Sequence, residues 1–106
     1  MRVVTSLTAL RRVPARAVVT VGVFDGVHIA HQRLIGSTVR LARRLHGASV
    51  VITFDPDPQT VLSPATAPPA LMSVASRLRH FQSLGVAWAI VLPFSRRFAR
   101  MSARQF

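Results

Sequence analysis

The stretch TVGVFDGVHIAHQRLI, residues 20–35, carries the chain from a run of β-branched residues into a helical pattern. Residues 17–21, AVVTV, are short and rich in valine, which predicts a strand buried on both faces of a parallel sheet. Gly22 and Gly26 then frame a loop, and from about residue 30 to residue 45 apolar side chains recur at helical spacing. The stretch therefore predicts a strand, a glycine-containing loop and the start of a helix.

The end of this first helix is marked by His46 and Gly47, and Gly47 is expected to take the left-handed conformation after the last turn. A second helix is predicted from Ser73, as its cap, to Leu84, with Gly85 closing it. Both helices are therefore bounded by local signals.

Two further strands complete the alternation. One is predicted over residues 49–54 and stops at the prolines of DPDP, residues 55–58; the other covers residues 86–92 and stops at Pro93. Strand, helix, strand, helix, strand in this order predicts an α/β fold with a three-stranded parallel sheet flanked by helices. A sheet this small is expected to expose an apolar edge.

The charge of the chain is strongly basic. Its 106 residues include 14 arginines, no lysine and only three acids, Asp25, Asp55 and Asp57, so the formal net charge is +11. An anionic partner is expected, such as a nucleotide, a nucleic acid or an acidic membrane surface. A GC-rich coding bias would also explain the use of arginine in place of lysine.

Cysteine is absent, so the chain has neither a disulfide framework nor a thiolate metal site. Its most apolar stretches, residues 48–54 and 85–94, are far shorter than the roughly 20 residues that a bilayer span needs. The sequence therefore predicts a soluble cytoplasmic protein that does not span a membrane, and a membrane is not among its predicted partners.

Chemistry is expected where the first strand gives way to the first helix, because free backbone N–H groups and the helix dipole attract anions there. His28 lies in the loop or cap region and His31 in the first turn, so both imidazoles can point toward one anion. Donating N–H bonds to phosphate oxygens, they would stabilise the charge on a phosphorus under in-line attack. Gly22 and Gly26 would let the phosphate approach closely.

Several simpler interpretations remain open for these residues. The two histidines also fit a solvated helix start; as zinc ligands they lack a third ligand at the usual spacing, so no metal site is predicted. Asp25 fits a turn, since Asp-Gly favours one, and Phe24 fits either the core or the cover of a ligand. Residues 55–58 fit a rigid strand-ending turn or a ligand contact at the carboxyl edge of the sheet.

Three separated motifs resemble those of one family. VVTVGVFDGVHIAHQRLI, residues 18–35, is similar to the pattern VVTIGxFDGVHxGHQxLI of the bacterial bifunctional riboflavin kinase/FMN adenylyltransferases, the FAD synthetases. VITFDPDPQTVLSP, residues 51–64, resembles TFxPHPxxVLxP, and residues 76–106 resemble KxxLLxxLGVDxxLVLPFxxxFAxLSxxxF. The likeness covers nearly the whole chain.

The resemblance implies a Rossmann-like nucleotidyltransferase fold, truncated, with residues 1–106 as the N-terminal portion of the FMN adenylyltransferase domain and no riboflavin kinase domain. It implies transfer of AMP from ATP to FMN, giving FAD and pyrophosphate, with Mg²⁺ and without a bound prosthetic group. His28 and His31 fall on the family's HxGH motif and are the implied catalytic, ATP phosphate-binding residues. The implied nucleotide-binding loop contributes Gly22, Phe24, Asp25 and Gly26.

Departures from the family pattern accompany the likeness. Ala30 stands where the family has Gly, Asp57 replaces the His of PHP, and Arg77 occupies a Lys position to which no role is assigned. The chain also stops before later family motifs, so we expect it to need self-association or a missing C-terminal half. The residues SARQ, 102–105, match a capping box for a further helix.

Two alternatives to the enzyme remain at this stage, a non-catalytic basic module that binds nucleotides or RNA and an inactive gene fragment. RNA is the less favoured partner, because the aromatic side chains lie in apolar segments typical of a core: Phe81, Trp88, Phe94 and Phe98. Arg96, Arg97 and Arg100 fit a solvated basic helix better than a phosphate site.

Overall fold

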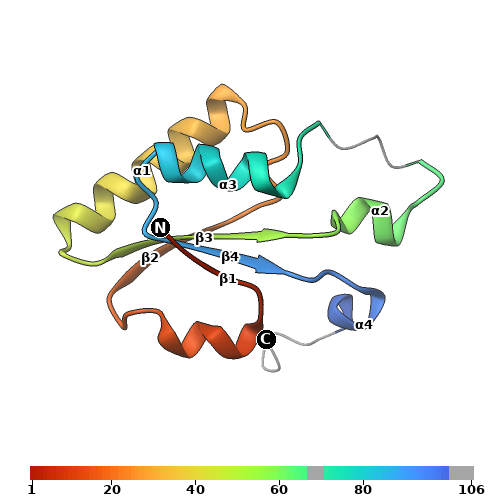
Figure 1. Cartoon of the computed structure of the whole chain (residues 1–106), viewed down its shortest axis with the longest axis horizontal. Helices are drawn as coiled ribbons and strands as arrows, with labels where there is room; N and C mark the ends of the chain where they lie inside the picture. The colour runs from red at the N-terminus through yellow and green to blue at the C-terminus, as the bar shows by residue number, and fades with distance from the viewer. Residues whose placement is uncertain (67–70, 101–106) are drawn as a thin grey trace.

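A computed structural model describes residues 1–66 and 71–100 of the chain; the predicted capping box at residues 102–105 lies outside this part. The described residues form one four-stranded sheet in the order β1-β4-β3-β2, in which every neighbouring pair is parallel (Figure 1). The elements follow the chain as β1 (Arg2–Val4), η1 (Leu7–Arg12), β2 (Ala17–Val21), α1 (Ile29–Arg44), β3 (Ala48–Phe54), α2 (Pro58–Leu62), α3 (Val74–Ser83), β4 (Trp88–Leu92) and α4 (Arg96–Ala99).

The predicted α/β fold, a parallel sheet with flanking helices, is confirmed. The bounds of α1, β3, α3 and β4 differ from the predicted ranges by no more than one or two residues. Ser73 caps α3 as predicted, because its Oγ accepts a hydrogen bond of 3.1 Å from the backbone N–H of Ser76.

The termination of α1 differs from the prediction. His46 takes the left-handed conformation, with φ at 53°, whereas a Cβ on Gly47 would lie only 2.7 Å from the carbonyl oxygen of Arg16. Gly47 is therefore needed for close packing against the segment before β2 and not for a positive φ.

A three-stranded sheet was the wrong prediction. β1 pairs with β4 over three positions, including Val3 with Ala89, and adds the fourth strand. A three-residue segment that begins with arginine has no hydrophobic periodicity, so nothing local marks it as a strand. Its pairing is a tertiary contact.

The sheet has a core on each face (Figure 1). On one face, α1 and α3 cover a cluster that includes Ile35, Val51 and Phe81, each 0% exposed. On the other face, a second cluster lies around Trp88 and Ile90. Val13, directly after η1, and Phe98 of α4 pack against it. No helix within residues 1–66 and 71–100 is long and apolar enough to cross a membrane.

β2 forms one of the two edges of the sheet and exposes several of its side chains, so the prediction that it is buried on both faces is wrong. Val21 is 55% exposed, although its register partner Ile52 in the neighbouring strand is 5% exposed. Valines suit a half-buried pleated surface as well as a fully buried one, and composition does not separate the two positions.

A lysine at this edge tests its exposure. Val21→Lys is expected to change the free energy of unfolding by less than about 0.5 kcal/mol, because the side chain faces solvent, and to lower association through the open edge. Ile52→Lys, the in-register control, is expected to cost about 3 kcal/mol or more, because it buries a charge. Urea denaturation and analytical ultracentrifugation measure both effects; equal costs for the two variants would contradict the exposure of Val21.

Candidate functional site

The loop between β2 and α1, residues 22–28, begins where β2 still pairs with β3, since the N–H of Gly22 donates to the carbonyl oxygen of Ile52 at 3.0 Å. The loop then turns through three residues with positive φ: Phe24 at 57°, Gly26 at 81° and Val27 at 41°. A positive φ is costly for a β-branched residue such as Val27, so the surrounding contacts must hold this conformation.

Both loop glycines make room for side chains of the loop itself. A Cβ on Gly22 would lie 2.8 Å from the Phe24 ring, and a Cβ on Gly26 would lie 3.1 Å from Cε1 of His28. Their predicted role was to admit a phosphate. In the structure, contacts with the Phe24 and His28 side chains already explain why glycine occupies both positions, and phosphate contact stays a prediction.

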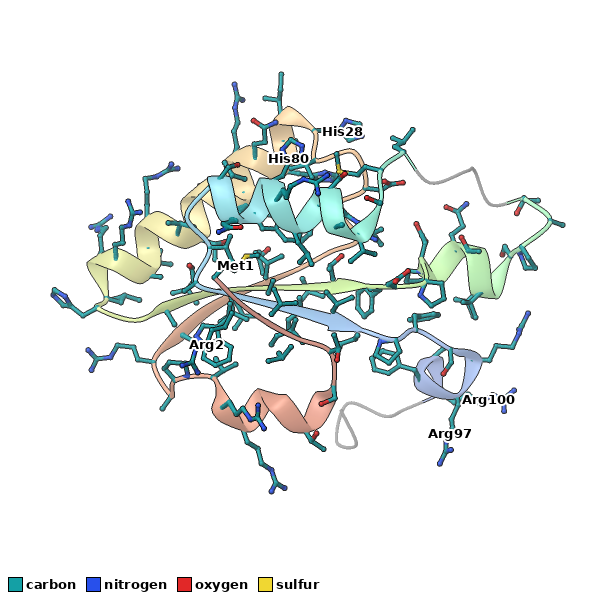
Figure 2. All side chains as sticks on the ribbon, viewed as in Figure 1. Met1, Arg2, His28, His80, Arg97 and Arg100 are labelled. Carbon is teal, nitrogen blue, oxygen red and sulfur yellow. The ribbon has the colours of Figure 1, made fainter. Side chains whose placement is uncertain are left out.

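His28 and His31 lie side by side at the start of α1. His28 is the N-cap, with φ −62° and ψ 168°, and His31 is the third helical residue. Their ring centroids are 5.3 Å apart with the planes tilted by 39°, and Nδ1 of His31 accepts a bond of 3.3 Å from the backbone N–H of His28. Figure 2 shows His28 at the outside of the molecule, at this end of α1.

The backbone bond determines which nitrogen of His31 can donate. Because Nδ1 accepts, the neutral ring carries its proton on Nε2. His28 is exposed and His31 half-buried, so the pair lies at the surface of the helix start. The two rings can therefore meet one ligand.

Phe24 belongs to the core and holds His31 in place. Its side chain is 4% exposed and its ring makes edge contacts with His31, at 5.2 Å between centroids, and with Phe81 of α3, at 5.9 Å. Of the two interpretations left open for Phe24, the structure supports the core.

Asp25 connects the loop to the segment before α3. Its two carboxylate oxygens accept hydrogen bonds from the backbone N–H groups of Leu71, at 2.8 Å, and Met72, at 2.9 Å. The side chain is thus committed to a tertiary contact in addition to any role in the turn. Charge-assisted bonds of this kind are among the stronger ones in proteins.

The second predicted loop lies beside the first. Asp57 caps α2 through a bond of 2.8 Å from the N–H of Gln59 to Oδ1, which explains an acid at this position. Asp25, Asp55 and Asp57, the three acids of the chain, line one pocket of about 230 Å³ together with Arg77. The two loops therefore share the carboxyl edge of the sheet, as predicted.

Arg77 is the residue that the sequence analysis left without a role. It is 6% exposed, and Nη1 donates to Val23 O at 2.8 Å, to Thr53 Oγ1 at 2.8 Å and to Phe54 O at 3.3 Å. The available signal was its position four residues before Phe81, on the same helix face, which places it toward the core.

Neither the arginines of residues 96–100 nor Ala30 adds a group to the histidine pair. Arg96, Arg97 and Arg100 are exposed on α4, and Figure 2 shows Arg97 and Arg100 pointing away from the body of the protein, far from His28. The expected solvated basic helix is confirmed. Ala30 lies within α1, where a methyl group does not strain the backbone.

The possible metal ligands of the described residues are not gathered into a metal site. Within residues 1–66 and 71–100, no three His, Cys, Asp or Glu side chains are grouped so that they could hold a metal ion. Two of the three carboxylates already accept backbone hydrogen bonds.

A parallel α/β sheet whose carboxyl edge carries a glycine-containing loop and a helix start is an arrangement that many nucleotide-binding domains share. The family model for FAD synthetase matches residues 10–106, and the chain belongs to this family. The resemblance of the three sequence motifs is thereby confirmed.

Similar proteins agree with this assignment. The bifunctional riboflavin kinase/FMN adenylyltransferase of Escherichia coli K12 is 30% identical over 107 residues, covering 100% of this chain and 34% of that protein. The protein of the same name from Bacillus subtilis 168 is 33% identical over 93 residues, covering 87% and 29%. The chain spans about a third of the length of these curated relatives.

One solved structure matches the fold closely. A crystal structure titled as a macrolide-efflux protein from Streptococcus pneumoniae superposes with a TM-score of 0.77 at 31% identity, covering 98% of this chain and 42% of that one. The arrangement of strands and helices is thus found in an experimental structure.

A methyl group at Gly26 tests the loop geometry. Gly26→Ala is expected to lower the free energy of unfolding by about 1–2 kcal/mol, because the residue has a φ of 81° and its Cβ would press on the His28 ring. Gly36→Ala is the matched control, because Gly36 is helical and its Cβ would meet only the end of the Arg40 side chain, at 3.3 Å. This control is expected to gain up to about 1 kcal/mol in urea denaturation; a stabilised Gly26 variant would contradict the loop geometry.

Proposed function

We propose that this chain binds the phosphates of ATP for transfer of AMP to FMN, which yields FAD and pyrophosphate. The observation that carries the proposal is the pair of imidazoles, 5.3 Å apart, at the amino end of α1. Family membership supports the choice of reaction, since the curated relatives are named as FMN adenylyltransferases.

In the proposed reaction an oxygen of the FMN phosphate attacks the α-phosphorus of ATP. A new P–O–P bond forms as the bond between the α-phosphorus and the bridging oxygen to the β-phosphate breaks, and the electron pair leaves with pyrophosphate. The attacking phosphate is already ionised, so no general base is needed. Positioning and stabilisation of charge supply the catalysis.

His28 and His31 supply the charge stabilisation. The Nε2–H of His31 is available to a phosphate oxygen because Nδ1 is held by the backbone, and His28 adds a second ring beside it. The positive end of the α1 dipole acts in the same direction. Loss of one such donor costs about 10²–10³ in rate in other enzymes.

Magnesium is proposed to enter as part of the substrate, the Mg-ATP complex. All three carboxylates, Asp25, Asp55 and Asp57, lie in the two loops, and among the described residues two of them, Asp25 and Asp57, already accept backbone N–H bonds. The donor set therefore fits a metal held by the nucleotide phosphates better than one held by the protein.

Calorimetric titration with Mg-ATP tests the binding step. His28→Ala and His31→Ala are each expected to weaken binding about 10-fold, because each removes one phosphate donor. His46→Asn, at the opposite end of α1, removes a histidine while tolerating the positive φ, and is expected to bind as the unaltered protein does. Titration at low and high salt identifies general anion attraction, which fades with salt and ignores the histidines; that pattern would contradict a specific site.

Formation of FAD tests the chemical step. Incubation with Mg-ATP and FMN, followed by chromatographic detection of FAD and assay of pyrophosphate, is expected to show both products in equal amounts. Either histidine-to-alanine variant is expected to lower the rate about 100-fold or more. ATP binding without FAD formation would reject the transfer reaction while leaving the phosphate site in place.

A further inference from the structure

We propose that Arg77 is a positioning residue that fixes the loop of residues 22–28 and, through Phe24, the ring of His31. This inference rests on the proposed nucleotide site. It assigns a function to a buried cation that neither the loop motif nor the histidine pair includes.

Burial of Arg77 is costly and, among residues 1–66 and 71–100, is not offset by an ion pair. The side chain is 6% exposed, and within the described residues its hydrogen bonds go to neutral oxygens. Its Nε is buried and has no hydrogen-bond partner there. An apolar side chain of similar size would fill the space without desolvating a charge, so core packing alone does not explain an arginine.

The bonds of Arg77 converge on the start of the loop. The carbonyl oxygen of Val23 accepts from Nη1 of Arg77 and from Oγ1 of Thr53, both at 2.8 Å. Val23 directly precedes Phe24, the first residue with positive φ. Two donors on this carbonyl therefore fix the peptide plane from which the loop turns.

α3 holds the next residue of the loop as well. Phe81, four residues after Arg77, contacts the ring of Phe24, and Phe24 contacts His31 at 5.2 Å between centroids. One face of α3 thus fixes a backbone carbonyl and a side chain at two successive loop positions. A shift at Val23 would reach the His31 ring through a single side chain.

The geometry of the Arg77 hydrogen bonds determines which substitutions can test them. All three acceptors lie within 3.3 Å of one nitrogen, Nη1, whose two hydrogens they share, and the forked guanidinium is not used in a bidentate way. A lysine ammonium presents three donors from one point, on a side chain one atom shorter. Arg77→Lys therefore keeps the charge and a set of donors for these acceptors, whereas Arg77→Met keeps much of the volume and removes the donors.

The experiment compares these two variants with Arg79→Met, which removes the same charge from an exposed position of α3. One measurement is the affinity for Mg-ATP by calorimetry. The other is the ¹⁵N chemical shifts of the His31 ring at constant pH, which report its tautomer and hydrogen bonding. Circular dichroism and thermal denaturation show which variants are folded.

Arg77→Met is expected to weaken Mg-ATP binding about 10-fold and to move the His31 ring shifts toward those of a free imidazole, since misplaced groups lose much of their effect. Arg77→Lys is expected to stay within about 3-fold of the unaltered protein and keep its ring shifts. Arg79→Met should match the unaltered protein in both measurements. Should Arg77→Met fail to fold, Thr53→Val replaces it, because it keeps the arginine but removes one donor to Val23 O and one acceptor of Arg77; His31 shifts in the same direction are expected.

Unchanged His31 shifts and unchanged affinity in a folded Arg77→Met or Thr53→Val variant would overturn the inference. So would a Lys variant as impaired as the Met variant, or an equal loss of affinity in Arg79→Met. Failure of the unaltered protein to bind Mg-ATP would instead reject the proposed function, and the His31 shifts would still decide the role of Arg77.

Discussion

The parallel pairing of β2 with β3 is the constraint on which the rest of the site depends. The two strands run in register from Ala17 with Ala48 to Val21 with Ile52, so both reach their carboxyl ends at one edge of the sheet. Loops of residues 22–28 and 55–58 consequently meet there, although they are separated in the sequence by a whole helix. Without this pairing, neither the pocket of the three acids nor the contact of Arg77 with both β3 and the loop after β2 would exist.

At that edge the strained backbone belongs to the loop of residues 22–28, whereas the contacts that stabilise it come from other elements. The loop itself holds Phe24 and Val27 at positive φ, which is unfavourable locally. The supporting contacts come from α3 and the segment before it, through Arg77, Phe81 and the backbone amides that bind Asp25. A loop stabilised in this way holds the histidines in one geometry, which the proposed stabilisation of a developing phosphate charge would require.

The sequence was informative where the signal is local. Ser73 as a helix cap, glycines at the first loop and the helical spacing that places His28 and His31 together all follow from one segment read alone. β1 and the exposed position of β2 could not be predicted, because a strand's place in the sheet is decided by its neighbours. Arg77 was missed for a related reason, since its acceptors lie 23 to 54 residues away in the chain.

The sequence by itself determined the alternation of β2, β3 and β4 with α1 and α3, the glycine loop ahead of a histidine pair and the excess of positive charge, since these depend on residue spacing and composition. Tertiary structure alone decided which strands lie at the edges of the sheet, that Phe24 and Asp25 hold the loop, and that an arginine of α3 fastens it to the sheet. Those outcomes depend on contacts between segments far apart in the chain. No local pattern encodes such contacts, because each segment could pair with several other segments until the sheet has formed.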